Sequence, residues 1–377
     1  MEILLKSDGF CMSYNRINNK KIYIRDKILG NNNKILVQSM LNVDVNNIKS
    51  NIIQAKQLQN AGSDIVRLAV PDFNAVKLIS VLKENIDIPV VADIHFNPKL
   101  AVESVVAGAD KIRINPGNIV QKKDIKLIAN VCNGYKVPLR VGVNSGSLEN
   151  GILNSGFVEE YDEFFEDFNE FEKNNIKALI FQVRKCVNWL EDFDFDNIVI
   201  SVKSSCIKIC TKAYEILAQI YKYPLHLGIT SAGTEKYGII KSSIGIGSLL
   251  LRGIGDTIRV SLSADPVIEV ETGILILKSL GLYHDSVEII SCPTCGRSSI
   301  NVVELAKKAE KLLGNIKKNV KIAIMGCPVN GPGEARDADL GVTGANGFGI
   351  IFKKGVIVKK IPEELILSTL LEEVKNL

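Results

Sequence analysis

Short runs rich in Val, Ile and Leu alternate with longer segments in which apolar residues recur every three or four positions, and this pattern fills residues 35–262. Nearly continuous apolar runs are typical of strands buried on both faces, and the longer segments suit crossover helices. The predicted strands are Ile35–Met40, Asp64–Val70, Ile88–Ile94, Lys111–Asn115, Pro138–Asn144, Ile198–Lys203, Pro224–Thr230 and Thr257–Leu262. The predicted helices include Ile48–Ala61, Phe73–Asn85, Pro98–Gly108, Glu159–Phe193, Ile207–Tyr221 and Lys241–Leu251.

Eight such strand and helix units indicate an α/β fold, a (β/α)8 TIM-type barrel. An open doubly wound sheet is the structural rival. No Gly-x-Gly-x-x-Gly turn follows the first strand, which disfavours the dinucleotide-binding version of that rival. A short hairpin around Lys20–Ile24 is possible before the barrel begins.

After Leu280 the pattern changes to that of a small α+β domain. Its predicted elements are a strand at Val287–Ile290, a helix at Val302–Leu313, a strand at Val320–Met325, a hairpin at Gly349–Ile361 and a closing helix at Glu363–Lys375. We therefore expect a barrel domain over residues 1–284 and a second domain over residues 285–377, whose two strands each lead into a cysteine-bearing loop.

Composition and charge narrow the possible partners. The 377 residues are 46% hydrophobic with a net charge of +4 and no long block of one sign, so neither nucleic acid nor a membrane surface is an expected partner. The N-terminus lacks a basic region followed by an apolar run, so we expect a cytoplasmic protein. Most cysteines outside the C-terminal motif are expected to be reduced and buried, among them Cys206 and Cys210 on one helix face.

Polar side chains gather at the carboxyl ends of the predicted strands, where the reactive face of such a barrel lies. Five of them are cations, one on each of five strands: Arg67, Arg113, Arg140, Lys203 and Arg259. Several cations around one mouth need an anion to balance them, and the arginine fork suits phosphate oxygens. The sequence therefore predicts a phosphorylated or diphosphorylated substrate. Asp93 and His95 end another strand, and His95 could be a general acid, a phosphate donor or a structural group.

Three cysteines of the second domain have the spacing of a metal site. Cys292 and Cys295 form a Cys-x-x-Cys pair, and Cys327 follows in a Gly/Pro-rich loop. A redox dithiol would leave Cys327 unexplained, and structural zinc wants a closed set of four ligands, whereas an iron-sulfur cluster tolerates three thiolates. The spacing thus favours a cluster over zinc. A fourth protein ligand would be an oxygen donor on the Cys327 loop, either Asn330 or Glu334.

Two loop sequences carry a resemblance to a known family. They are Cys-Pro-Thr-Cys-Gly-Arg from Cys292 and Gly-Cys-Pro-Val-Asn-Gly-Pro-Gly-Glu-Ala from Gly326. Together they resemble the signature of the 4-hydroxy-3-methylbut-2-en-1-yl diphosphate synthases of the non-mevalonate isoprenoid pathway. Matching barrel segments occur at residues 37–40, 91–96, 111–118, 140–144, 199–203, 226–230 and 255–261, so the resemblance covers nearly the whole chain.

The resemblance implies an iron-sulfur oxidoreductase that opens and dehydroxylates 2-C-methyl-D-erythritol 2,4-cyclodiphosphate. It implies a [4Fe-4S] cluster on Cys292, Cys295 and Cys327, with Glu334 as an exchangeable fourth ligand. It also implies a homodimer in which the cluster domain of one subunit covers the barrel mouth of the other, with ferredoxin or flavodoxin as electron donor. From their places at the strand ends and on the Cys327 loop, the residues that we expect to bind the substrate are Arg67, Arg113, Arg140, Asn144, Lys203, Arg259, Ser261 and Asn330.

The chain departs from the family pattern at one position. Where the family motif continues His-Leu-Gly-Ile-Thr-Glu, this chain has Ser231 in place of the glutamate. Serine cannot replace a carboxylic acid as a proton donor, so either Glu235, or His95 with Asp93, supplies the proton, or the protein is slow or altered in activity. Two other functions stay open: a phosphate-binding barrel synthase or lyase of the dihydropteroate-synthase type with structural zinc, and a non-catalytic iron-sulfur scaffold or redox sensor.

Overall fold

The computed structural model describes residues 16–148, 165–283, 286–314, 316–329, 333, 335–345 and 347–377. This part of the chain divides after Leu280 into two compact units, which are described separately below. Among the described residues, no helix is both long and apolar enough to cross a membrane.

The first unit is built around an eight-stranded parallel sheet in the order β8-β7-β6-β5-β4-β3-β10-β9. An isolated parallel bridge between Ile200 and Leu225 links β8 to the chain entering β9, so the ends of the sheet meet as a barrel. The prediction of a (β/α)8 barrel is therefore confirmed. The strands are β3 (Leu36–Met40), β4 (Ile65–Ala69), β5 (Val90–Ile94), β6 (Lys111–Ile114), β7 (Leu139–Asn144), β8 (Ile198–Lys203), β9 (His226–Leu227) and β10 (Thr257–Ile258).

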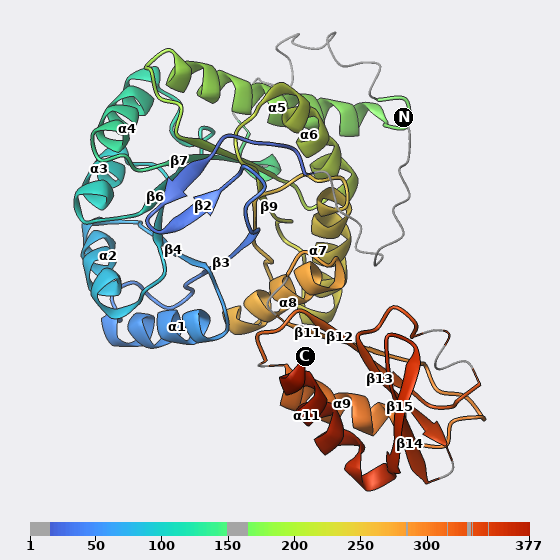
Figure 1. Ribbon diagram of the computed structural model, residues 1–377. Helices are drawn as coiled ribbons and strands as arrows, with labels where there is room; N and C mark the ends of the chain where they lie inside the picture. The colour runs from blue at the N-terminus through green and yellow to red at the C-terminus, as the bar shows by residue number, and fades with distance from the viewer. Residues whose placement is uncertain are drawn as a thin grey trace. The chain divides into compact units, whose positions relative to one another are not determined.

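Helices surround these strands (Figure 1). Asn47, Asp72, Asn97 and Asp265 each accept a hydrogen bond from a backbone N–H in the first turn of a helix, which satisfies a donor that the helix leaves free. Two helices, α4 and α8, are additional to those predicted, and α7 begins six residues before Lys241. The set is α1 (Ile48–Asn60), α2 (Phe73–Asn85), α3 (Pro98–Val106), α4 (Lys122–Gly134), α5 (Glu170–Glu191), α6 (Ile207–Ile220), α7 (Glu235–Leu250) and α8 (Pro266–Ser279).

A small antiparallel hairpin closes the amino-terminal end of the barrel. It consists of β1 (Ile22–Ile24) and β2 (Lys27–Leu29), near the position the sequence suggested, and it lies across the strands in Figure 1. Its buried side chains form one apolar cluster with side chains from four barrel strands: Ile22, Ile24, Leu29, Leu36, Ile65, Val91 and Val199. The hairpin therefore covers the amino-terminal end of the barrel with apolar side chains.

The second unit contains a mixed sheet in the order β11-β12-β13-β14-β15, parallel from β11 to β13 and antiparallel thereafter. Helices α9 and α11 share a core with this sheet. The strand β13 was not predicted, and the closing helix is preceded by a 3-10 turn, η4 (Glu363–Leu365). The elements are β11 (Val287–Ser291), α9 (Val302–Leu313), β12 (Val320–Met325), β13 (Leu340–Ala345), β14 (Phe348–Lys353), β15 (Val356–Pro362) and α11 (Ile366–Asn376).

Candidate active site

Strand register brings the predicted cations together inside the barrel. Asp93 on β5 pairs with Arg113 on β6, and Arg113 pairs in turn with Arg140 on β7. Directly paired residues project to the same face of a sheet, so these three side chains share the barrel interior. The three, together with Arg67 and Lys203, are at most 8% exposed.

Asp93 is the anionic centre of this cluster. Its Oδ1 lies 2.9 Å from Arg113 Nη1, and its Oδ2 lies 3.6 Å from Arg67 Nη2 and 3.5 Å from His95 Nε2. Burial alone would raise the pKa of this carboxyl, but the charges of Arg67 and Arg113 outweigh burial and hold the pKa well below its ordinary value. Asp93 is therefore an ionised carboxylate at neutral pH, which suits holding cations in place and does not suit donating a proton.

A second carboxylate holds Arg259. Glu269, on α8, is buried and accepts hydrogen bonds from Arg259 Nη2 at 3.2 Å, from the Leu262 backbone N–H at 2.9 Å and from Ser39 Oγ at 3.3 Å. Arg67, by contrast, lies against the other carboxylate, Asp93. Burial lowers the pKa of Arg67 to about 10, and the charge of Asp93 acts in the opposite direction. Glu269 was not predicted, because α8 itself was not.

Two further basic side chains of the interior are short of hydrogen-bond partners among the described residues. Arg140 is 1% exposed, and its Nε and Nη1 have no hydrogen-bond partner among the described residues. Lys111 is fully buried and its Nζ likewise has no described partner. A buried charge without a counter-ion is costly, and a guanidinium stays protonated at neutral pH. The interior is therefore built to receive an anion.

Two glycines leave room for the cations. A Cβ on Gly142 would lie 2.6 Å from Arg113 Nε, and a Cβ on Gly228 would lie 3.1 Å from Lys203 Nζ. The first contact would require Arg113 to shift, and the second is tight enough that Lys203 would have to give by a few tenths of an ångström. Glycine at these two positions therefore leaves space for the charged side chains.

The other predicted barrel residues lie around the mouth. Asn144 ends β7 and Ser261 follows β10, and both are half-buried. The His95 side chain is 39% exposed beside Asp93. Glu235 is exposed at the first position of α7, and Ser231, with a φ of 51°, is exposed in the loop before it. Of the candidate acids, His95 is the one that the structure places against the charged cluster.

The second unit brings two of the cysteine loops together. Strands β11 and β12 are parallel neighbours, so Cys292 after β11 and Cys327 after β12 follow the same edge of the sheet. The Gly326 N–H donates to Cys292 Sγ at 3.2 Å, and the Ser299 N–H donates to the Gly326 carbonyl at 2.9 Å. Cys292 and Cys327 are half-buried, and Cys295 is exposed.

The two cysteine loops have some, but not all, of the features of a metal site. Within the described part of the chain, no three histidine, cysteine, aspartate or glutamate side chains lie close enough together to hold a metal ion. The predicted residues Asn330 and Glu334, and also His284, lie outside the described residues. The donor set nevertheless fits a cluster in kind, because thiolates on adjoining loops with an N–H donated to sulfur are typical of iron-sulfur sites.

Cysteines in the barrel are of a different kind. Cys132, Cys186 and Cys210 are buried, and burial raises the pKa of Cys186 to about 12 and that of Cys210 to about 11. Cys206 differs from the expectation, because it is half-buried in the position before α6 and not packed on its face. The three buried thiols therefore behave as small apolar groups and not as ligands.

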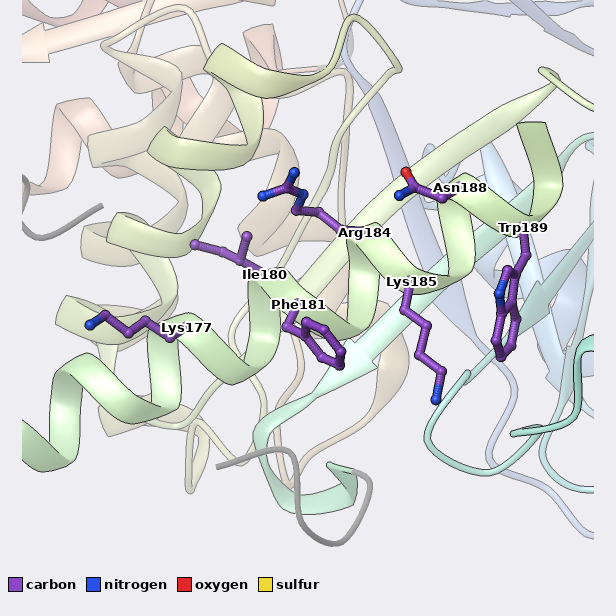
Figure 2. A pocket seen from close by; sticks show the side chains of 7 residues that line it. All are labelled: Lys177, Ile180, Phe181, Arg184, Lys185, Asn188 and Trp189. Carbon is purple, nitrogen blue, oxygen red and sulfur yellow. The ribbon is translucent and has the colours of Figure 1, made fainter. Parts of the chain in front are cut away.

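A hollow of about 360 Å³ lies on the outer face of α5, where Phe181, Arg184 and Trp189 are among its lining residues (Figure 2). All of its described lining residues come from this one helix, and among them there is no carboxylate, cysteine or histidine. The described residues of the hollow therefore offer no acid or metal ligand, and the barrel interior is the candidate active site.

Comparison with known proteins matches both units to one family. Residues 19–274 match the GcpE TIM-barrel domain, and residues 288–376 match the GcpE protein C-terminal domain. The chain belongs to the GcpE family. Among its GcpE relatives, the 4-hydroxy-3-methylbut-2-en-1-yl diphosphate synthase (flavodoxin) of Clostridium acetobutylicum is 47% identical over 362 residues, which are 96% of this chain and 99% of the relative. The protein of the same name from Caldanaerobacter subterraneus subsp. tengcongensis is 48% identical over 95% of this chain and 97% of its own length.

Solved structures of other families resemble the GcpE barrel alone. Dihydropteroate synthase from Stenotrophomonas maltophilia superimposes with a TM-score of 0.50 and 14% identity, covering 69% of this chain and 97% of its own. At that identity the likeness shows the fold and carries no statement about the reaction.

Proposed function

We propose that this protein is an oxidoreductase that converts 2-C-methyl-D-erythritol 2,4-cyclodiphosphate to 4-hydroxy-3-methylbut-2-enyl diphosphate by reductive ring opening and loss of hydroxide. The observation that carries the proposal is the barrel interior, where buried cations outnumber the carboxylates in contact with them and where Nε and Nη1 of Arg140 have no hydrogen-bond partner among the described residues. The names of the relatives supply the diphosphate that this charge would accept.

The barrel residues would bind the diphosphate and orient the ring. Arg140 has free N–H groups to donate, and Lys203, pushed towards its neutral form by burial and then by the charge of Arg259, would regain its proton beside an anion. Asp93 would keep Arg113 and Arg67 in position through its two oxygens. Three further residues are proposed to contact the substrate: Asn144 and Ser261 at the barrel mouth, and Asn330 from the second unit.

A [4Fe-4S] cluster is the proposed cofactor, held by Cys292, Cys295 and Cys327 with Glu334 as the fourth ligand. When bound, such a cluster supplies electrons one at a time, which amino-acid side chains cannot do. The chain's own contribution is the thiolate set and the N–H of Gly326, which donates to Cys292 Sγ and would stabilise its negative charge.

His95 is the proposed proton donor to the departing hydroxide. Its Nε2 lies 3.5 Å from an ionised Asp93 carboxylate, which can orient the ring. Glu235 is the competing donor, and its exposed place on α7 would require it to move to reach a buried substrate. Ser231, in the position of the family's glutamate, is not assigned a role in proton transfer.

Substitution at the two candidate donors separates them. His95→Gln should lower turnover by about a hundredfold or more while iron content stays unchanged, because general acids typically contribute that much. Glu235→Gln should have little effect. The opposite pattern would assign the proton to Glu235.

Flavodoxin is the proposed electron donor, as the names of the relatives suggest, with ferredoxin as the alternative. The active form is proposed to be a cytoplasmic homodimer in which the cluster of one copy serves the barrel of the other. Mixing an Arg140→Met protein with a Cys292→Ser protein tests that arrangement. Activity should recover in the mixture if barrel and cluster come from different copies, and it should not recover if both come from one chain.

Cofactor analysis and turnover together test the function. Protein purified without oxygen should contain iron and sulfide and should consume the cyclodiphosphate when reduced flavodoxin is supplied. Stoichiometric zinc without iron would favour a barrel synthase or lyase with a structural metal, as in the dihydropteroate-synthase type of fold. Iron and sulfide without consumption of the cyclodiphosphate would favour a redox sensor.

A further inference from the structure

Lys111 lies in the barrel interior, closer to the amino-terminal end of the barrel than Arg113. It begins β6 and pairs with Val91 on β5, whose side chain is part of the apolar cluster with the β1-β2 hairpin. Arg113 lies two residues further along the same strand, so both side chains project to the barrel interior. Lys111 therefore stands between this apolar cluster and the cation layer.

No described group compensates a charge at this position. The Lys111 side chain is fully buried, and its Nζ has no hydrogen-bond partner within the described residues. Asp93 and Glu269, the carboxylates of the interior, are already engaged by Arg67, Arg113 and Arg259. Burial, followed by the charges of Arg140 and Arg67, lowers the pKa of Lys111 well below its ordinary value.

We propose that Lys111 is a neutral amine in the substrate-free protein and takes up one proton from solvent when a diphosphate binds to the arginines above it. The amine gains a proton to become an ammonium ion, and no bond of the substrate is changed. Lys111 is then a positioning residue, which acts through charge and not through contact with the reacting atoms. The inference rests on the proposed function, because it requires a diphosphate in the barrel.

Other groups facing the same interior could respond instead. They are Arg67, Asp93, His95, Arg113, Arg140, Lys203, Glu269, Arg259 and His226, the last fully buried with its Nδ1 2.7 Å from Thr257 Oγ1. The guanidinium groups are protonated throughout, and Asp93 is ionised throughout. Burial and then Arg140 lower the pKa of His226, so His226, Lys203 and the partly exposed His95 are the competitors that the experiment must separate from Lys111.

The cyclodiphosphate is a suitable ligand for measuring proton uptake by the protein, because its own protonation does not change near neutral pH. Each phosphorus of a cyclic diphosphate diester carries one strongly acidic oxygen, so the ligand itself neither gains nor loses a proton near neutral pH. Isothermal titration calorimetry of the oxygen-free protein without reductant, in buffers of different ionisation enthalpy, then gives the protons taken up by the protein. Lys111→Met removes the amine and keeps an unbranched side chain, and Lys56→Met changes an exposed lysine on α1 in the same way.

The wild type and Lys56→Met should take up about one proton more per bound ligand than Lys111→Met. Because proton uptake and affinity are linked, wild-type affinity should fall more steeply with rising pH than that of Lys111→Met, by about tenfold per pH unit where the difference is one full proton. Equal uptake in the wild type and Lys111→Met would overturn the inference, and loss of uptake in His95→Gln, His226→Asn or Lys203→Met instead would move the role to that residue. Absence of any binding by the wild type would instead contradict the proposed diphosphate site.

Discussion

Asp93→Asn should destabilise the substrate-free barrel strongly. The carboxylate is 2% exposed and lies within 4 Å of three basic groups, on Arg67, His95 and Arg113. Asparagine keeps the shape and removes the charge, which leaves Arg67 and Arg113 buried without their counter-ion. Removing one partner of a buried ion pair typically costs about 3–5 kcal/mol, and we expect a loss in that range in the free energy of unfolding.

Tryptophan fluorescence during urea unfolding measures this loss on the barrel itself. Trp189 is the single tryptophan of the sequence and lies on α5, in the barrel unit. Its signal therefore follows the barrel even if the second unit unfolds separately. Asp192→Asn is the matched control, because it removes an exposed carboxylate 2.7 Å from Lys122 and should change stability little.

The pH dependence has a defined sign. A carboxyl whose folded pKa is depressed contributes stability that is present above its unfolded pKa and is lost as the pH falls through its folded pKa. The difference between wild type and Asp93→Asn should therefore be full at neutral pH and shrink below about pH 4. A difference no larger than that of Asp192→Asn at neutral pH, or one that grows as the pH is lowered, would refute this electrostatic account.

Three further predictions follow from close contacts in both units. Gly142→Ala should weaken cyclodiphosphate binding roughly tenfold by displacing Arg113, while Gly134→Ala, whose Cβ would meet nothing within 4 Å, should not change it in the same calorimetric titration. Gly326→Ala, whose Cβ would lie 2.3 Å from Ser298 Oγ, should lower iron per chain and leave ligand binding to the barrel intact. Cys292→Ser should lower iron and sulfide content, whereas the buried Cys132→Ser should not.

Hydrophobic pattern predicts most of this fold because a buried parallel strand and an amphipathic helix differ in period. The strand β8 and the helices α2 and α9 have the predicted bounds. The strand β13 is harder to predict because it contains Gly341 and Gly344, and glycine is a poor indicator of a strand. The helix α8 is apolar on most sides and shows little periodicity, whereas α4 has helical spacing at Ile125, Ile128 and Cys132 and could have been predicted.

The candidate site also has features that the sequence predicts and features that it does not. Cations on strands are visible in the sequence, and Lys111, two residues before Arg113, has the spacing that would have added it to the group. The partners are not visible, since the contacts of Asp93 with Arg113 and of Glu269 with Arg259 depend on register and on a helix from elsewhere in the chain. The exposure of a side chain cannot be predicted from the sequence either, and only the structure shows that Glu235 is exposed.

Anaerobic reduction of the cyclodiphosphate with a chemical reductant tests the central claim most directly, because it needs no protein partner. Phosphorus NMR of the reaction should show the cyclic diphosphate replaced by a linear allylic diphosphate with the wild-type protein. Arg140→Met, with its iron and sulfide retained, should leave most of the cyclodiphosphate unchanged. Unchanged cyclodiphosphate with iron-loaded wild type, or full conversion by Arg140→Met, would contradict the account of the barrel as the site that binds and presents the diphosphate.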